Sequence, residues 1–219
     1  MTMMRRYCCA LAGLAVLALA GFACRSAYYA AWEAVGKEKR DLLRSDVGKV
    51  QDDQRAAVET FQSALDRLRA LGAVDAPELE STYDKLNGDY QRAESRAEAV
   101  RARVASIESI AADLFAEWER EAASISSADL RAKSRHKLVA TKQHYGELRA
   151  KLKTAEGRMD PVLTQLRDQV LYLKHNLNAA AIGGLRAEVT NIEGDIRQLV
   201  KDTQSSIAEA NAFLERFEK

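Results

Sequence analysis

The feature that most constrains the fold is an apolar repeat whose steps alternate between four and three residues. It runs without a slip over residues 79–118. This spacing puts apolar side chains at the a and d positions of successive heptads, which is typical of helices packed along their whole length. A surface helix of a globular domain has a wider and less regular stripe. The members are Leu79, Tyr83, Leu86, Tyr90, Ala93, Ala97, Val100, Val104, Ile107, Ala111, Leu114 and Trp118.

Three other segments carry a similar repeat, so the chain is predicted to form four long helices. Their approximate bounds are 26–72, 77–123, 128–177 and 179–217. Each spans about 60 to 75 Å at 1.5 Å per residue, and short connections make neighbouring helices antiparallel. Two prolines and few aromatic residues agree with long helices. The sequence therefore predicts an all-α protein, an elongated four-helix bundle with up-down-up-down topology.

Turn and capping residues separate these segments. The first repeat stops at Gly72, after which Asp75 is a plausible N-cap with Pro77 in the first helical turn. Ser127 is expected to cap the third helix, because its hydroxyl can accept a hydrogen bond from a free backbone N–H. Asn178 is expected to cap the last helix.

Pro161 lies inside the third segment and allows two interpretations. Proline removes a helical hydrogen bond and clashes with the preceding turn, so Asp160 and Pro161 could begin a separate helix. However, the apolar phase passes from Met159 to Val162 and Leu166 without a reset. A continuous third helix that is kinked at Pro161 is the favoured reading.

The first 23 residues have the parts of a secretory signal peptide. Arg5 and Arg6 form a charged start, and residues 8–23 are apolar or small. The run is short for a membrane span, which needs about 20 apolar residues. We therefore expect residues 1–23 to be removed and residues 24–219 to form a single elongated helical domain.

Cys24 bears on the compartment. All three cysteines lie at or before this position, so a disulfide framework is excluded from the rest of the chain. One reading is an ordinary cut that leaves Cys24 near a free end; the other is acylation of Cys24. A single cysteine where the signal ends favours acylation. Arg25 after it points to anchoring at the outer membrane rather than sorting to the inner one.

Several stretches together resemble a bacterial family catalogued as domain of unknown function 2959. They are "SAYYAAWEAVGKEKRDLL" (26–43), "ADLFAEWE" (112–119) and "MDPVLTQLRDQVLYLKHNLNAAAI" (159–182). The match covers essentially the whole chain after the signal. The resemblance implies an exported, lipoprotein-like helical protein whose lipobox cysteine corresponds to Cys24. It implies no activity, substrate or cofactor.

The charge balance argues against nucleic acid as a partner. Without Arg5 and Arg6 the chain has 31 basic (33 − 2) and 32 acidic residues, a net charge of −1, so no global field attracts a polyanion. A local basic strip over residues 129–158 could bind anionic lipid or an anionic envelope polymer. Pairing with acidic residues of the second helix is the favoured explanation. Those acids are Glu108, Asp113, Glu117, Glu119 and Glu121.

No residue pattern of a metal, cofactor or catalytic site stands out in the sequence. His136, His144 and His175 lack the Glu-x-x-His pattern of a di-metal bundle, and they are interpreted as solvated. Hydrolytic motifs and phosphate-binding glycine loops are absent from the sequence. We expect a protein that is not an enzyme, with no cofactor.

Two ends of the bundle attract attention. The stretch "LYLKHNLN" is a polar cluster that is read mainly as a turn, with Lys174, His175 and Asn176 as the possible partner surface. At the opposite end the topology brings together five rings, which should pack favourably. They are Trp32, Phe115, Trp118, Phe213 and Phe217.

The leading functional hypothesis is a non-enzymatic, lipid-anchored spacer, scaffold or adaptor in the periplasm, held to the membrane and contacting envelope proteins. One alternative is a peripheral binder of membrane or an anionic envelope polymer through the basic strip; strong salt dependence would identify it. Another is a helical-bundle enzyme with an unrecognised site, which a deep polar pocket between helices would support.

Overall fold

The computed structural model describes Tyr29, Trp32 and residues 36–70, 79–176 and 179–218. The described part is all-helical, with no strand in these ranges. Cys24, Asp75, Pro77 and Asn178 lie outside the described residues, so the predictions made for them stay predictions.

The chain divides into two compact units, Met1–Leu43 and Arg44–Lys219. The boundary falls inside helix α2, which runs over Lys39–Ala70. The prediction of a single domain over residues 24–219 stays a prediction.

In the first unit, the continuous helix predicted over residues 26–72 is interrupted at Gly36. This residue has φ +76°, a left-handed conformation that glycine adopts without steric cost. The Lys37 N–H donates to the Trp32 carbonyl at 3.0 Å, the bond expected at a glycine-ended helix. A new start follows, because the Asp41 carboxylate accepts from the Glu38 N–H at 3.2 Å, as in a capping box.

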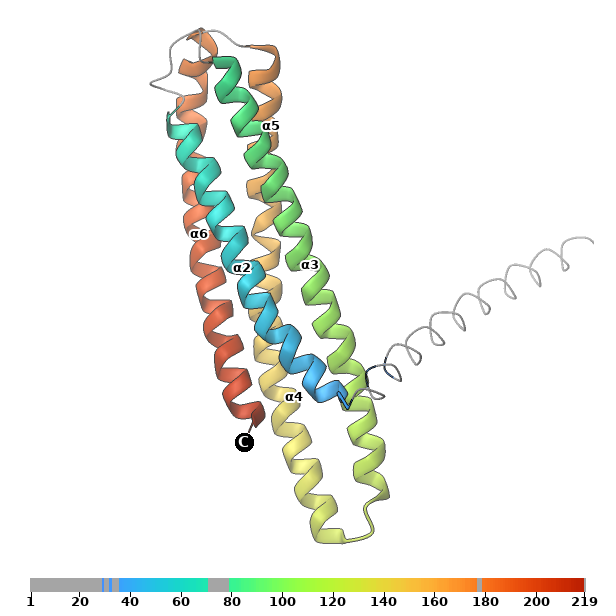
Figure 1. Cartoon of the computed structure of the whole chain (residues 1–219). Helices are drawn as coiled ribbons and strands as arrows, with labels where there is room; N and C mark the ends of the chain where they lie inside the picture. Colours follow the sequence, from blue (N-terminus) through green and yellow to red (C-terminus); the bar gives the residue numbers. More distant parts are fainter. Residues whose placement is uncertain (1–28, 30–31, 33–35, 71–78, 177–178, 219) are drawn as a thin grey trace, which may run out of the picture. The chain divides into compact units, whose positions relative to one another are not determined.

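The second unit holds the rest of α2 and four further helices that lie side by side (Figure 1). Helices α3 and α6 each pack against α4 and α5, and α2 is bonded to both α3 and α6. The helices are α3 (Leu79–Ser124), α4 (Ala128–Gly157), α5 (Met159–His175) and α6 (Ala179–Glu218). The predicted bundle of helices is confirmed at this level.

The apolar repeat forms the core of the second unit. Burying such a side chain stabilises the fold by about 1.5–3 kcal/mol, so the repeat accounts for the packing of the long helices. From α2 the buried members include Val47, Val50, Ala57, Phe61, Ala64 and Leu68. From α3 they include Leu86, Ala93, Ala97, Val100, Val104, Ile107 and Ala111. From α6 they include Ile192, Ile196, Leu199, Ala210 and Phe217.

The third segment is divided into α4 and α5 by one residue, Arg158, which keeps helical dihedral angles of φ −75° and ψ −17°. The cause is Pro161, because it has no N–H to donate to the Gly157 carbonyl one turn earlier. Asp160 is not the N-cap, since α5 begins at Met159. The apolar phase continues through the interruption, with Ala155, Met159, Val162 and Leu166 all buried.

The turn between α3 and α4 has the predicted cap. Ser127 is the N-cap of α4, and its hydroxyl accepts from the Leu130 N–H at 3.4 Å. Arg131 closes the turn by donating to the carbonyls of Ile125 at 2.9 Å and Ser126 at 3.2 Å, which are left unpaired where α3 ends.

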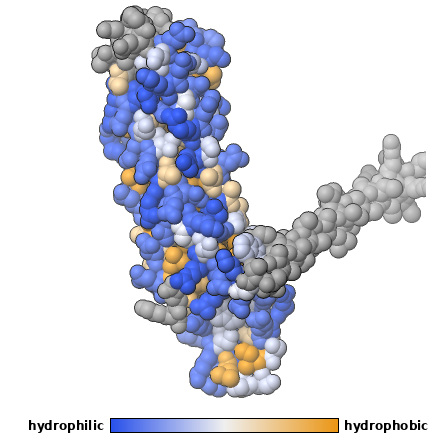
Figure 2. All heavy atoms as spheres, viewed as in Figure 1, coloured by the Kyte–Doolittle hydropathy of each residue, from blue (hydrophilic) through white to orange (hydrophobic). Residues whose placement is uncertain are grey.

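One predicted core residue near this turn is not buried. Leu130 is 57% exposed, and Val139 on the same helix is 67% exposed. Figure 2 shows apolar atoms gathered on this end of the second unit. The reason is that α6 reaches α4 only as far as Arg216, which contacts His144 and Glu147. The repeat thus extends past the end of the helix that covers α4.

Three of the five predicted aromatic rings form a cluster with Tyr145, which the prediction did not include. The ring centroid of Tyr145 lies 5.4 Å from that of Phe115 and 6.4 Å from that of Phe213. Phe213 stacks on Phe217 with 5.1 Å between their ring centroids. Burial raises the pKa of Tyr145 to about 12. Trp118 donates instead to the Ser134 hydroxyl at 2.9 Å. Trp32 belongs to the first unit, so its place in the cluster stays a prediction.

Candidate functional site

The interface between α2 and α6 contains a layer of buried polar side chains within the apolar repeat. Gln54, Thr203 and Ser206 are 0%, 1% and 0% exposed. The Gln54 amide donates to the Ser206 hydroxyl at 3.0 Å. Among the described residues, the Gln54 Oε1 and Thr203 Oγ1 atoms have no hydrogen-bond partner. A buried polar atom without a partner costs about 1–3 kcal/mol, so two such atoms in one layer are unusual in a folded protein.

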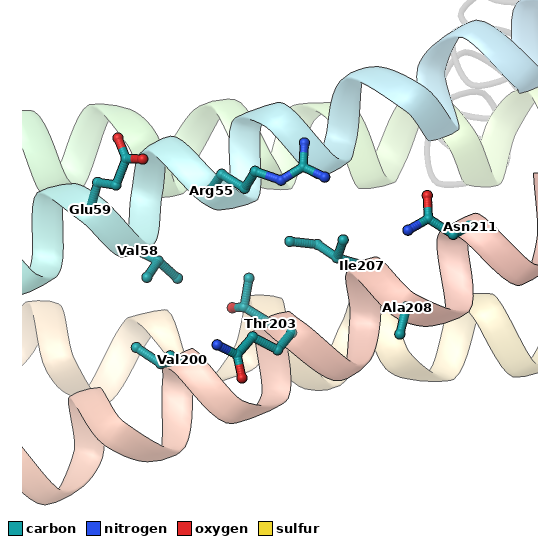
Figure 3. A pocket seen from close by; sticks show the side chains of 9 residues that line it. Arg55, Val58, Glu59, Val200, Thr203, Ile207, Ala208 and Asn211 are labelled. Carbon is teal, nitrogen blue, oxygen red and sulfur yellow. The ribbon is translucent and has the colours of Figure 1, made fainter.

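A groove of about 410 Å³ runs beside this layer. Three residues of α2 and six of α6 line it, and Figure 3 shows these side chains on either side of the space between the two helices. Its size falls in the range of ligand sites, about 300–1,000 Å³. The lining residues are Arg55, Val58, Glu59, Val200, Thr203, Gln204, Ile207, Ala208 and Asn211.

The groove has an apolar lining and a polar rim of both charges. Val58, Val200 and Ile207 supply half-buried apolar surface. Arg55 is half exposed and pairs with Asp52 at 2.7 Å. Helical periodicity puts Glu59 one turn further along the same face of α2. This arrangement can bind a molecule with an apolar body and a charged head.

The opposite flank of α2 faces α3 with a different chemistry. The buried Asp89 carboxylate accepts from both Arg67 and Arg92. The buried Asp46 carboxylate accepts from the Ser106 hydroxyl at 2.7 Å and from Arg103 at 3.3 Å. These carboxylates have the partners that a buried charge requires, so the flank has a structural role.

The partner surface predicted at the end of α5 is a helix terminus. Lys174 and His175 are exposed, and Asn176 is half-buried. Asn176 is the C-cap of α5, and its side chain donates to the Tyr172 carbonyl at 2.9 Å. Residues 171–175 of this stretch belong to α5 and Asn176 ends the helix, whereas residues 177–178 lie outside the described part. The turn and the role as a partner surface therefore both stay predictions.

The basic strip of α4 is partly paired with α3. Lys142 contacts Glu119 at 2.5 Å, and Arg149 contacts Glu108 at 2.6 Å. The expected pairing between the two helices is therefore present at these two positions. This leaves less free positive charge for an anionic polymer.

The histidines do not come together. His144 lies 3.4 Å from Glu147 and 3.1 Å from Arg216, whereas His136 and His175 are exposed at other positions. Over the part of the chain that the structure describes, no cluster of three or more His, Cys, Asp or Glu side chains is placed to hold a metal ion. None of the described helices is long and apolar enough to cross a membrane.

The groove was missed by sequence reasoning, although part of its signal was visible. Gln54 and Thr203 occupy apolar positions of the repeats in the first and last helices. A polar residue at an apolar repeat position in each of two neighbouring helices indicates a buried polar layer. The groove beside them depends on side-chain packing, which the repeat alone does not encode.

Comparison with known proteins identifies a family and no individual relative. Neither the curated proteins nor the solved structures gave a match. Residues 28–217 match the family described as "Protein of unknown function (DUF2959)". The match covers both described units except the last residue of α6, and it includes the groove and the predicted partner surface. The chain therefore belongs to the DUF2959 family of proteins of unknown function.

Proposed function

We propose that the protein is an exported, lipid-anchored helical spacer or scaffold of the cell envelope, without enzymatic activity. The observation that carries this proposal is the length of α3 and its continuous packing. This helix has 46 residues, or about 69 Å at 1.5 Å per residue. Ion pairs join it to α2 through Arg103, to α4 through Glu108 and to α5 through Arg101.

The proposed topology is up-down-up-down, with a bend at Pro161. The contacts between helices support an antiparallel arrangement of neighbours. As the residue number rises along one helix, the number of its partner residue on the neighbouring helix falls. Arg158 meets Asp202, whereas Gln165 meets Asp195. Arg149 meets Glu108, whereas Lys142 meets Glu119.

The bend is tested by Pro161→Ala. This change restores an N–H that can donate to the Gly157 carbonyl, so we expect the free energy of unfolding to stay equal or to rise by about 1 kcal/mol. A clear loss of stability in urea denaturation would mean that the proline is needed to begin a separate helix.

Rigidity is the property that a spacer requires. Spin labels at Glu80 and Glu121, both exposed near the ends of α3, should be separated by about 60 Å. The chain without residues 1–23 and with Cys24→Ser would carry the labels, so that no other thiol reacts. A narrow distance distribution in pulsed electron paramagnetic resonance supports a rigid spacer, and a broad one contradicts it.

The anchor is tested separately, because it rests on Cys24 and on the signal sequence. Mass spectrometry of the native protein should show an N-terminal Cys24 that carries acyl chains, and fractionation should place it at the outer membrane, facing the periplasm. An unmodified N-terminus at Gly21 or Cys24 would remove the anchor from the proposal and leave the spacer.

A further inference from the structure

We propose that the groove between α2 and α6 binds a single-chain zwitterionic amphiphile. Such a molecule has one acyl chain and a head group with both a phosphate and an ammonium. The inference goes beyond the role of spacer and does not depend on it.

The shape of the groove fits one chain. Its α6 lining runs from Val200 to Asn211, which corresponds to about 16 Å of helix. Val58 faces this stretch from α2, and Figure 3 shows Ile207 directed into the space between the helices. The groove has a volume of about 410 Å³ along this stretch. Covering it with an acyl chain removes apolar surface from water.

The rim selects a head group that carries both charges. Arg55 and Glu59 are separated by one turn on the same face of α2, about 5–6 Å between their Cβ atoms. The Arg55–Asp52 pair is exposed to solvent, so it holds the guanidinium weakly. Glu59 is exposed, and no ion pair of its carboxylate occurs among the described residues. Glu59 and Asp52 both disfavour a purely anionic head, whereas the phosphate of a zwitterionic head can replace Asp52 at the Arg55 guanidinium while its ammonium pairs with Glu59.

Thr203 adds a buried hydroxyl without a hydrogen-bond partner to the wall of the groove. It lines the groove, is 1% exposed, and its hydroxyl has no hydrogen-bond partner in the described part of the chain. Buried hydroxyls in folded proteins are nearly always paired. The Oγ1 atom is itself shielded from solvent, so the hydroxyl or ester carbonyl next to the head of a single-chain phospholipid supplies this partner only after the Thr203 side chain turns towards the groove.

The binding experiment compares three probes that share a lauroyl-length chain and differ in the head group. They are lysophosphatidylethanolamine, which is zwitterionic, lysophosphatidylglycerol, which is anionic, and an alkyl maltoside, which is neutral. Each is titrated below its micelle concentration into the chain without residues 1–23, and the methyl signals of Val58, Val200 and Ile207 are followed by NMR. We expect saturable shifts with the zwitterionic probe. Binding of each other probe should be weaker by roughly tenfold, the loss expected for one charge-assisted hydrogen bond.

Matched variants locate the binding. Ala208→Trp fills the groove from an exposed position and should abolish the shifts, whereas Ala150→Trp on the exposed face of α4 should not change them. Arg55→Gln and Glu59→Gln should each weaken binding by roughly tenfold, with Glu98→Gln as the exposed control on α3. Circular dichroism confirms that each variant is folded.

Three results would overturn the proposal. The first is the absence of saturable shifts with the zwitterionic probe. The second is equal binding of all three probes, which would indicate simple partition of an alkyl chain. The third is unchanged binding by a folded Ala208→Trp variant.

Discussion

In the second unit, helix α2 buries different kinds of polar groups against its two neighbours. Towards α3 it uses charges, and the buried Asp46 and Asp89 carboxylates both have cationic partners. Towards α6 it uses neutral side chains, and two buried oxygen atoms there, on Gln54 and Thr203, have no partner among the described residues. The first interface is therefore specified by its ion pairs, whereas the second is left with unmet hydrogen-bonding capacity beside a groove.

The difference suggests that the two sides of α2 have different roles. A paired buried carboxylate fixes which residues of α2 and α3 lie opposite each other, because a shift of one turn would separate the charges. An unpaired neutral atom gives no such restraint in the free protein. It leaves hydrogen-bonding capacity that the proposed ligand can use.

The largest effect is expected from breaking the charged interface. Asp89→Ala removes the acceptor shared by Arg67 and Arg92. Losing one partner of a buried pair costs about 3–5 kcal/mol, but both arginines can reach water, so we expect a loss of about 2 kcal/mol. Urea denaturation measures it. Asp66→Ala removes an exposed carboxylate that is paired with Arg69 and should cost less than about 1 kcal/mol. Equal losses for the two variants would contradict the contrast.

Removing buried polar groups from the interface between α2 and α6 should instead raise the free energy of unfolding. Gln54→Leu replaces a fully buried amide by an apolar side chain of similar volume and removes an oxygen that has no partner in the described part. The change also takes the donor away from the buried Ser206 hydroxyl, and this offsets the gain from removing the unpaired oxygen. The double variant Gln54→Leu with Ser206→Ala removes both partners, so we expect its free energy of unfolding to rise by about 1 kcal/mol and to exceed that of Gln54→Leu alone. A destabilised double variant would mean that the amide is satisfied in solution.

A smaller gain is expected at the other unpaired atom. Thr203→Val keeps the shape of the side chain and removes the hydroxyl. Without ligand the variant should be more stable than the native chain by up to about 1 kcal/mol. With the zwitterionic amphiphile the native chain should gain more stability than the variant, because ligand binding stabilises the folded state. Thr154→Val is the control, since that exposed hydroxyl donates to the Ala150 carbonyl at 2.9 Å. Identical ligand-induced shifts in melting temperature for native chain and Thr203→Val would contradict the role of Thr203.

The sequence predicted the core better than these interfaces, for physical reasons. Repeat positions such as Val100 and Leu199 are buried because heptad spacing fixes the face on which they lie. The Ser127 cap is also local and was predicted correctly. The interruption at Gly36 was missed, although a glycine followed by Asp41 as the third residue of a new helix is a recognisable pattern. Leu130 failed as a core prediction because burial depends on where α6 ends, which is a tertiary property.

The smallest effect is expected from the exposed ion pair between α2 and α6. Arg69 contacts Glu193 at 2.8 Å, and its guanidinium lowers the pKa of the Glu193 carboxyl below the ordinary value of 4.5. A lowered folded-state pKa means that the pair stabilises the fold above the unfolded-state pKa and loses this contribution as the pH falls through the folded-state value. Glu193→Gln should therefore lower stability slightly at neutral pH and leave it unchanged at a pH below both values, as thermal denaturation across this range would measure. If the loss at neutral pH matched that of Asp89→Ala, the α2–α6 interface would be specified by charge as well, and the contrast between the two flanks of α2 would no longer hold.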